Sequence, residues 1–270
     1  MKDIRQTARY SRFMEAIGWK WERIDNIYIY SKKFPLVGVM IKIQRPAKLP
    51  KEKLIIELIK KYRPFSFLIE FDNQTPTNHF PFTNGTQPNI ATKTIHIDLT
   101  PSETEIFNNF SESKRRAIRR AQKYGVQVEI NQDIATLLNV KNRAGGLFGF
   151  MATSFVKPLW RVFAPDQVAC VLAYPNNSHT AFACIFLIWA QGVAYYWIAG
   201  ATRDAKKQFA PTLLVWEALK HAKAKGNTLF DFEGIYDERF PEHTDWLGFT
   251  KFKEGFGGNV VYFPKPIKVK

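Results

Sequence analysis

Three consecutive apolar segments, separated by short polar turns and followed by a helix-forming segment, constrain the fold most strongly. Residues 169–177, 180–190 and 192–202 are strand-like, and Pro, Asn, Ser and Gly fill the connections between them. Connections this short join neighbouring antiparallel strands. Residues 210–225 then show amphipathic helical periodicity and end at Gly226. We therefore expect a meander of strands followed by a helix, within an α/β arrangement.

The segments around this meander complete a larger pattern. A strand over 126–130 and helical segments precede it, and a strand over 228–235, a helix over 245–254 and a last strand over 259–264 follow it. This order resembles that of the GNAT acyltransferases. It implies mixed sheets flanked by helices.

A shortened version of the same order fills the first half of the chain. A helix over 7–17 precedes strand-like runs, a helix that begins at Pro50 and an apolar strand over 65–72. We expect an α/β (α+β) fold of two tandem GNAT-like domains. Their predicted bounds are 1–125, including a basic helix over 102–124, and 126–270, whose last strand packs back on the first domain.

The net charge points to a polyanionic partner. Lysine and arginine number 39 against 24 acidic residues, which gives a formal charge of +15, while 46% of the residues are apolar. Such an excess suits nucleic acid, anionic lipid or a phosphorylated substrate, although a basic surface that only confers solubility is the alternative. Cys170 and Cys184 lie in apolar surroundings and predict reduced thiols. With no signal-like start and no apolar run near ~20 residues, we expect a cytoplasmic protein that is able to touch a membrane surface.

Several classes of chemistry have no support in the residue pattern. The chain contains no H-E-x-x-H, P-loop, G-x-S-x-G or G-x-G-x-x-G sequence, and its five histidines are scattered without metal-ligand spacing. We therefore expect no metal, and no Ser-His or Cys-His catalysis.

The basic helix has two different faces. At 100° per residue, cationic side chains fall within an arc of about 140°, namely Arg115, Arg116, Arg119, Arg120 and Lys123. An apolar set falls on the opposite side and is expected to face the core, namely Phe107, Phe110, Ala117, Ile118, Ala121 and Tyr124. Arginine forks match phosphate oxygens, so the helix is a candidate phosphate-binding element. A solvated charged face, with Glu105 and Glu112 nearby, is the alternative.

The turn before the helix at Ala210 differs from its counterpart in GNAT acetyltransferases. In those enzymes, glycine-rich backbone N–H groups hold the coenzyme A pyrophosphate there. Here the turn reads RDAKKQFAPTLL, with Phe209 and Pro211 where the backbone would have to lie open. Proline also removes an N–H donor, so the sequence argues against ordinary acetyl-CoA binding.

Two short segments near the C-terminal end carry further candidates. In FDFEGIYD, Asp231 and Glu233 are expected on one face of a strand, where they bind an amine, pair with a base, or form a salt bridge to Lys251 or Lys253. In FTKFKEGFGG, three phenylalanines share a helical face and glycines end the helix. Lys253 lies about 100° from that face and is expected to be held without being buried.

Three segments resemble the FemABX (FemA/FemB/FemX) aminoacyltransferases, which build peptidoglycan cross-bridges. They are IHIDLTPSETEIFNNFSESKRRAIRRAQKYGVQV, APTLLVWEALKHAKAKGNTLFDFEGI and GFTKFKEGFGGNVVYFP. The opening segment, with Gln6 and Gly18-Trp19, and the Gln44-Arg45-Pro46 tripeptide are similar to weaker family patterns. Met14 stands where the family often has a lysine that helps to hold the precursor.

The resemblance implies a transferase that moves an amino acid from aminoacyl-tRNA to the stem-peptide amine of a peptidoglycan precursor, either lipid II or UDP-MurNAc-pentapeptide. It implies no cofactor and no metal. By the same resemblance, Lys253 and Asp72 are catalytic candidates and the precursor contacts are Arg45, Arg161, Tyr196 and Asp231. The phosphate contacts to tRNA are Arg115, Arg116, Arg119 and Arg120. A GNAT enzyme with another acyl donor, or a non-enzymatic RNA-binding module, remain alternatives.

Overall fold

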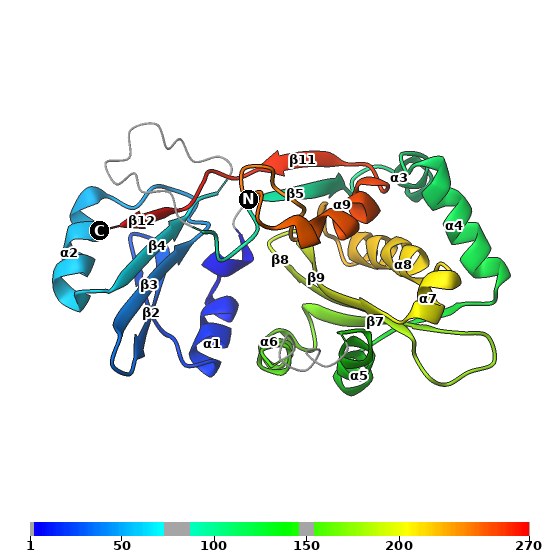
Figure 1. Cartoon of the computed structure of the whole chain (residues 1–270), viewed down its shortest axis with the longest axis horizontal. Coiled ribbons are helices and arrows are strands. Elements are labelled where there is room, and N and C mark those ends of the chain that lie inside the picture. Colours follow the sequence, from blue (N-terminus) through cyan, green and yellow to red (C-terminus); the bar gives the residue numbers. More distant parts are fainter. Residues whose placement is uncertain (1–2, 73–86, 146–153, 270) are drawn as a thin grey trace. The chain divides into compact units, whose positions relative to one another are not determined.

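The computed structural model describes residues 3–72, 87–145 and 154–269 (Figure 1). The chain forms two units, each built from separate stretches of sequence. Unit 1 comprises Met1–Lys93, Asp237–Pro241 and Val261–Lys270, and unit 2 comprises Thr94–Tyr236 and Glu242–Val260. Both contain a mixed sheet with helices, as the tandem GNAT-like prediction required.

Unit 1 is built on a five-stranded sheet of order β1-β2-β3-β4-β12. Its strands are β1 (Lys20–Ile24), β2 (Ile27–Phe34), β3 (Gly38–Gln44), β4 (Ser66–Glu70) and β12 (Ile267–Val269). Its helices are η1 (Ile4–Gln6), α1 (Ala8–Ala16) and α2 (Glu52–Tyr62). Since β3 and β4 run parallel, α2 forms the crossover between them. The core between α2 and the sheet includes Ile41, Ile55 and Phe67.

Unit 2 is built on a seven-stranded sheet of order β11-β5-β10-β9-β8-β7-β6. Its strands are β5 (Lys93–Asp98), β6 (Gln127–Asn131), β7 (Val168–Tyr174), β8 (Ala183–Ala190), β9 (Val193–Ala201), β10 (Leu229–Asp231) and β11 (Asn259–Tyr262). Its helices are α3 (Glu103–Asn108), α4 (Glu112–Lys123), α5 (Ile134–Gly145), α6 (Val156–Phe163), α7 (Arg203–Lys207), α8 (Ala210–Ala224), η4 (Thr244–Trp246) and α9 (Leu247–Glu254).

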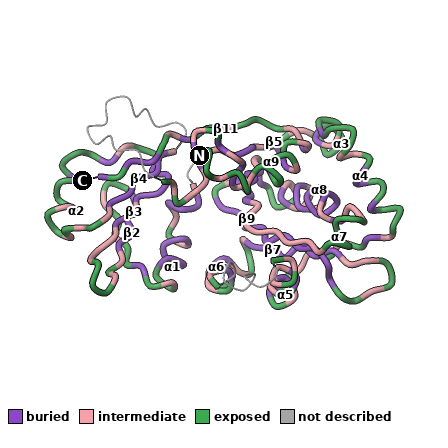
Figure 2. Tube along the Cα trace, viewed as in Figure 1, coloured by how far each residue is buried: buried purple, intermediate pink, exposed green. Residues whose placement is uncertain are grey.

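The meander predicted from the sequence is present in this sheet. Strands β6 to β9 pair antiparallel in chain order, whereas β10 runs parallel to β9 and antiparallel to β5. Helices α8 and α5 both contact β7, β8 and β9, from opposite faces (Figure 1). Every residue of β8 is buried as a result, and buried residues follow α8 and the middle strands (Figure 2).

The predicted helix over 102–124 is two helices. Ser102 begins α3 with a capping box that includes Glu105, and Ser111 begins α4 by accepting a hydrogen bond from the Lys114 N–H. The aromatic rings of Phe107 and Phe110 pack against Trp216 of α8 across this break. Two serine caps therefore outweigh the continuous helical periodicity.

The unit boundary also differs from the expected division at residue 125. Strand β5 pairs with β10, and α4 packs against α8, so residues 94–125 belong to unit 2. The chain also has a strand after the predicted last one, since β12 pairs antiparallel with β4 in unit 1. Residues 237–241 return to unit 1 as well. Contacts distant in sequence determine this division, and local periodicity does not encode them.

Candidate active site

A tight turn follows β10 and carries most of the candidate site. The strand ends at Asp231, and the backbone then turns through Glu233 at φ 55° and Gly234 at φ 122°. The Asp231 Oδ1 atom accepts the Glu233 N–H at 2.8 Å and the Thr94 hydroxyl at 2.6 Å. Thr94 Oγ1 in turn accepts the Gly234 N–H at 3.1 Å. The left-handed residue Glu233 therefore does not share a strand face with Asp231, contrary to our expectation.

Lys253 of α9 is bound to the backbone of this turn. Its Nζ donates to the carbonyl oxygens of Phe232 at 2.9 Å and Gly234 at 2.5 Å. The residue is 7% exposed, so the expectation that it escapes burial is wrong. Thr250, one helical turn earlier, accepts the Tyr236 N–H at 2.7 Å and holds α9 against the same segment. The ammonium group is thus positioned by backbone at the end of β10.

Aromatic rings surround the Lys253 ammonium. Its Nζ lies 5.5 Å from the ring centroid of Tyr196, 4.8 Å from that of Phe249 and 6.0 Å from that of Phe232. Burial lowers the pKa of Lys253 to about 8, against the opposing attraction of Asp231 and Glu233. The group is mostly cationic at neutral pH. Within the described residues, two of its three N–H groups are bonded to carbonyls, so the third suits an anionic partner.

Asp231 is an anionic support for this arrangement. Burial acts to raise the pKa of its carboxyl, but the hydrogen bond and charge of His96, with the bonds from Thr94 and Glu233, hold it below the usual value. His96 Nε2 lies 3.3 Å from Asp231 Oδ2. Both carboxylate oxygens therefore have partners in the protein. Of the alternatives for this residue, the structure contains pairing with a base, His96.

Tyr196 lies on β9 beneath Lys253. Its ring packs against Phe230 and Phe232, with centroids 6.4 Å and 5.6 Å away. Burial raises the pKa of its phenol, so the side chain stays neutral. The structure thus brings together three of the predicted site residues in unit 2: Lys253, Tyr196 and Asp231.

Three other predicted site residues are on other elements of the two units. Arg45, in unit 1, is buried at φ 51°, donates from Nη2 to the Ala91 carbonyl and lies over the ring of Phe263. Asp72, also in unit 1, follows β4 and is half-buried. Arg161 is exposed on α6 of unit 2.

The four arginines of α4 have different environments. Arg115 is half-buried and donates from Nη1 to the carbonyl oxygens of Asn108 and Phe110, so it caps the end of α3. Arg116, Arg119 and Arg120 are exposed. The three exposed arginines, unlike Arg115, are available for a ligand.

Lys114 is a second cation beside the FTKFKEGFGG segment that the sequence analysis missed. Its Nζ lies 3.8 Å above the ring centroid of Phe252 and 4.9 Å from that of Phe256, and burial lowers its pKa to about 8. A Cβ on Gly255 would lie 2.5 Å from its Cε. A lysine in the first turn of a helix is unfavourable because it opposes the helix dipole. This unfavourable position of Lys114 is the sequence signal that could have pointed to a special role for it.

The segment RDAKKQFAP, which replaces a glycine-rich loop, is helical. Arg203–Lys207 form α7, capped by Thr202, and Phe209 then adopts φ 58° before α8 begins. Pro211 lies in the first turn of α8. The backbone at this position is therefore a helical turn with its N–H groups largely bonded internally, as in the Lys206 and Gln208 N–H bonds to Thr202 and Asp204.

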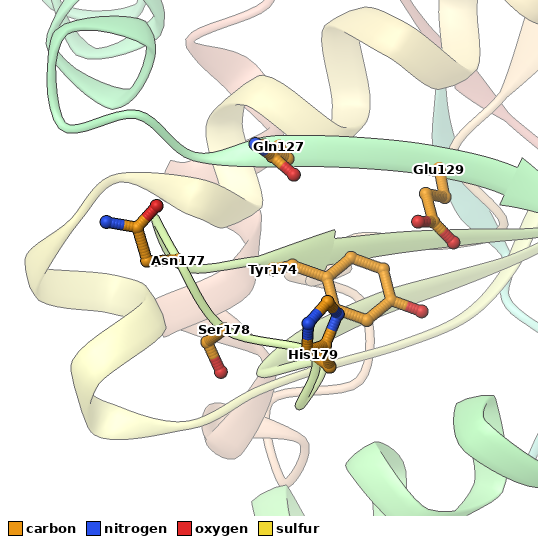
Figure 3. Close-up of a pocket in the computed structure, with 6 residues that line it drawn as sticks. All are labelled: Gln127, Glu129, Tyr174, Asn177, Ser178 and His179. Atoms are coloured by element: carbon orange, nitrogen blue, oxygen red, sulfur yellow. The ribbon is translucent and has the colours of Figure 1, made fainter.

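A polar cavity of about 560 Å³ lies at the other edge of the sheet, between β6, β7 and the following loop (Figure 3). Its lining residues are Gln127, Glu129, Tyr174, Asn177, Ser178 and His179. Burial and the neighbouring Glu129 raise the pKa of Tyr174. None of the candidate site residues lines this cavity.

Three further findings concern metal-ligand groups, thiols and membrane-spanning helices. In the part of the chain that the structure describes, histidine, cysteine and carboxylate side chains form no group of three or more suited to a metal ion. Cys170 and Cys184 are buried free thiols, as predicted, and burial raises the pKa of each to about 12. Across the described residues, no helix combines the length and apolarity needed to span a bilayer.

The fold is similar to those of several solved structures. FemX matches with a TM-score of 0.76 and 14% identity, over 98% of this chain and 92% of that one. The C-terminal domain of a putative lysylphosphatidylglycerol synthetase from Agrobacterium fabrum matches with a TM-score of 0.64 and 12% identity, over 98% and 88% of the two chains. L-PGS from Bacillus licheniformis matches with a TM-score of 0.58 and 14% identity, over 96% and 85%. A search of curated protein sequences found no match.

At 12–14% identity, these likenesses establish the fold alone. A family model described as an acetyltransferase (GNAT) domain matches residues 108–242, which is half of the chain. The chain belongs to this GNAT family.

Proposed function

We propose that this acyltransferase moves an amino acid from aminoacyl-tRNA to an amine on the stem peptide of a peptidoglycan precursor, for formation of the interpeptide bridge. The observation that carries the proposal is the buried ammonium of Lys253, held by two backbone carbonyls among aromatic rings in a fold similar to that of FemX. A second protein of similar fold is the C-terminal domain of a putative lysylphosphatidylglycerol synthetase. Its name also suits a donor that carries an amino acid.

The turn before α8 favours a donor other than coenzyme A. Backbone N–H groups that hold a pyrophosphate must point into open space at a helix N-terminus. Here the corresponding residues form α7, and Pro211 has no N–H to offer. A net charge of +15 suits tRNA and a phosphate-bearing precursor equally well.

The reaction needs charge stabilisation and positioning more than a protein nucleophile. The neutral acceptor amine attacks the ester carbonyl, a C–N bond forms, and the resulting oxyanion collapses as the C–O bond to the ribose breaks. The amine proton ends on the departing ribose oxygen. We assign oxyanion or phosphate stabilisation to the third N–H group of Lys253. Asp72 is the proposed acceptor of the amine proton, and carries it toward the ribose oxygen.

The precursor contacts follow the same proposal. Arg45, Arg161 and Tyr196 are assigned to the precursor, which is lipid-linked or UDP-linked. The three exposed arginines of α4 are assigned to tRNA phosphates, and Arg115 of the predicted set is not, because it is bonded to the end of α3. Asp231, whose carboxylate oxygens are bonded to its own chain, is assigned to positioning of the Lys253 turn. Both substrates suit a cytoplasmic enzyme, and a lipid-linked acceptor requires contact with the membrane surface.

The direct test is mass spectrometry of the acceptor after incubation with charged tRNA. Lipid II and UDP-MurNAc-pentapeptide are each offered with a pool of aminoacyl-tRNAs, and a gain of one amino-acid residue mass is expected. Lys253→Met should abolish the gain, whereas Lys251→Met, an exposed lysine of the same helix, should retain it. No mass gain with any amino acid on either acceptor overturns the proposal.

The family match supports a second candidate, acyl transfer from another donor. Acetyl-CoA and longer acyl-CoA thioesters replace charged tRNA in the same assay. A mass gain with a thioester but not with charged tRNA, together with an increase in melting temperature on addition of coenzyme A, would favour this candidate. Binding of RNA with no transfer from either donor would favour an RNA-binding module.

A further inference from the structure

An aromatic contact joins residues that lie just after helices α4 and α7. Phe209, which follows α7, stacks on Tyr124 at the end of α4, with ring centroids 6.4 Å apart and planes 14° apart. The guanidinium of Arg120 lies 5.5 Å from the Phe209 ring centroid. Helices α4 and α7 lie on the same side of unit 2 (Figure 1), and their exposed residues together are called here the α4–α7 surface.

The charge of this surface is strongly one-signed. Its exposed cations are Arg116, Arg119, Arg120 and Lys123 on α4, and Arg203, Lys206 and Lys207 on α7. The two helices carry two carboxylates, Glu112 and Asp204, which pair with Arg116 at 3.5 Å and with Lys207 at 3.3 Å. The remaining cations repel one another unless a polyanion neutralises them.

Tyr124 adds a ring to this cationic surface. It was expected to face the core, but it is 53% exposed. Its partner Phe209 has a left-handed backbone, which is an outlier for a bulky residue and is held by the surrounding structure. An exposed ring among arginines and lysines is the arrangement on which unpaired bases stack while the backbone phosphates meet cations.

We infer that the α4–α7 surface binds RNA, with its cations on the phosphates and Tyr124 stacked on an unpaired base. The inference rests on the proposed function, because the RNA would be the tRNA donor, and it extends the donor site beyond the α4 arginines to α7 and an aromatic ring. The segment that holds a pyrophosphate in coenzyme A-dependent relatives would thereby serve a larger phosphate ligand.

Fluorescence anisotropy with labelled, uncharged tRNA tests the surface without requiring transfer. Lys206→Gln/Lys207→Gln should weaken binding about tenfold and reduce the slope of log K against log salt by roughly 2. The matched control is Lys53→Gln/Lys60→Gln, which removes the same charge from exposed positions of α2. An equal loss in both double variants would show that net charge alone acts, and would overturn the inference.

The ring has its own test. Tyr124→Ala should weaken tRNA binding about tenfold while leaving the salt slope unchanged, and Tyr124→Phe should retain wild-type affinity. Because Tyr124 is exposed, both variants are expected to keep the wild-type melting temperature. Unchanged affinity in Tyr124→Ala would overturn the stacking role.

Vesicles that contain anionic phospholipid serve as the competing ligand. Binding to vesicles that the α7 variants abolish, without any effect on tRNA, would assign the surface to membranes and overturn the inference. The proposed reaction and the proposed RNA-binding surface can fail separately. Binding of tRNA through this surface without transfer to any acceptor would leave the inference standing and overturn the proposed reaction.

Discussion

The hydroxyl of Thr94 lies 2.6 Å from the Asp231 carboxylate and donates to it, although the two residues are 137 positions apart in the chain. The hydroxyl oxygen of Thr94 also accepts the Gly234 N–H at 3.1 Å. Thr94 thereby fixes both ends of the turn whose carbonyls hold Lys253. A residue on β5 thus sets the position of an ammonium on α9.

Thr94→Val should disturb this turn without changing the shape of the side chain much. Valine leaves the buried Gly234 N–H without its acceptor and removes one donor from Asp231, which costs about 1–3 kcal/mol of unfolding free energy. Misplacement of Lys253 should also lower kcat about tenfold or more, with a smaller effect on KM. Urea unfolding and steady-state transfer measure the two effects. Thr94→Ser, which keeps the hydroxyl, should restore both, and full activity in Thr94→Val would refute the positioning role.

Lys253→Met should leave a folded protein with little activity. Methionine fills the aromatic surroundings but supplies no charge, so transition-state stabilisation should fall by about 10²–10³-fold in kcat. The readout is the transfer rate at saturating substrate, with circular dichroism as the check on folding. Lys251→Met controls for the loss of one charge from the same helix, and an equal loss of activity in both would contradict the assignment to Lys253.

Stability should rise with pH in a window set by Lys253. Its folded-state pKa of about 8 lies below the ordinary value of 10.5, because burial disfavours the charged form. Between these values the unfolded chain binds more protons, so the free energy of unfolding increases from pH 8 to pH 10.5, by about 3 kcal/mol for this group.

The measurement is chemical denaturation at several pH values in wild type and Lys253→Met. The free energy of unfolding of wild type minus that of Lys253→Met should increase as the pH rises, because methionine has no group that titrates. Activity that depends on the cation should fall over the same range above pH 8. A constant difference in stability from pH 7 to pH 10 would contradict the lowered pKa.

Gly258→Ala should be more damaging than Gly255→Ala. Gly258 has φ 87°, and an added Cβ would collide with the backbone carbonyl of His96. At Gly255 the added Cβ would meet the flexible Lys114 side chain instead, at 2.5 Å from its Cε. We expect losses of about 3 kcal/mol or more at Gly258 and about 1 kcal/mol at Gly255. Thermal unfolding gives the order, and Gly255→Ala combined with Lys114→Ala should recover stability. A larger loss at Gly255 would refute this account.

The sequence predicted the elements better than their environments. The meander and the helix after it follow from periodicity and turn residues, because one strand pairs with the next along the chain. The burial of Lys253 did not follow, since its acceptors are the carbonyls of Phe232 and Gly234, which no pattern of side chains reveals. The exposure of Tyr124 was missed for a related reason. Its apolar arc was correct for Ala117 and Ile118, but at the end of α4 the ring pairs with Phe209 outside the core.

The division of unit 1 among three stretches of sequence bears on how the protein folds during synthesis. Strand β12 is translated after all of unit 2, yet it pairs with β4 in the sheet of unit 1. Until it arrives, β4 has an open edge, which is a hazard for pairing with other chains. Unit 1 therefore cannot complete its fold before unit 2 has been translated. We expect unit 2 to become stable first on the ribosome, and fragments cut at residue 93 to aggregate.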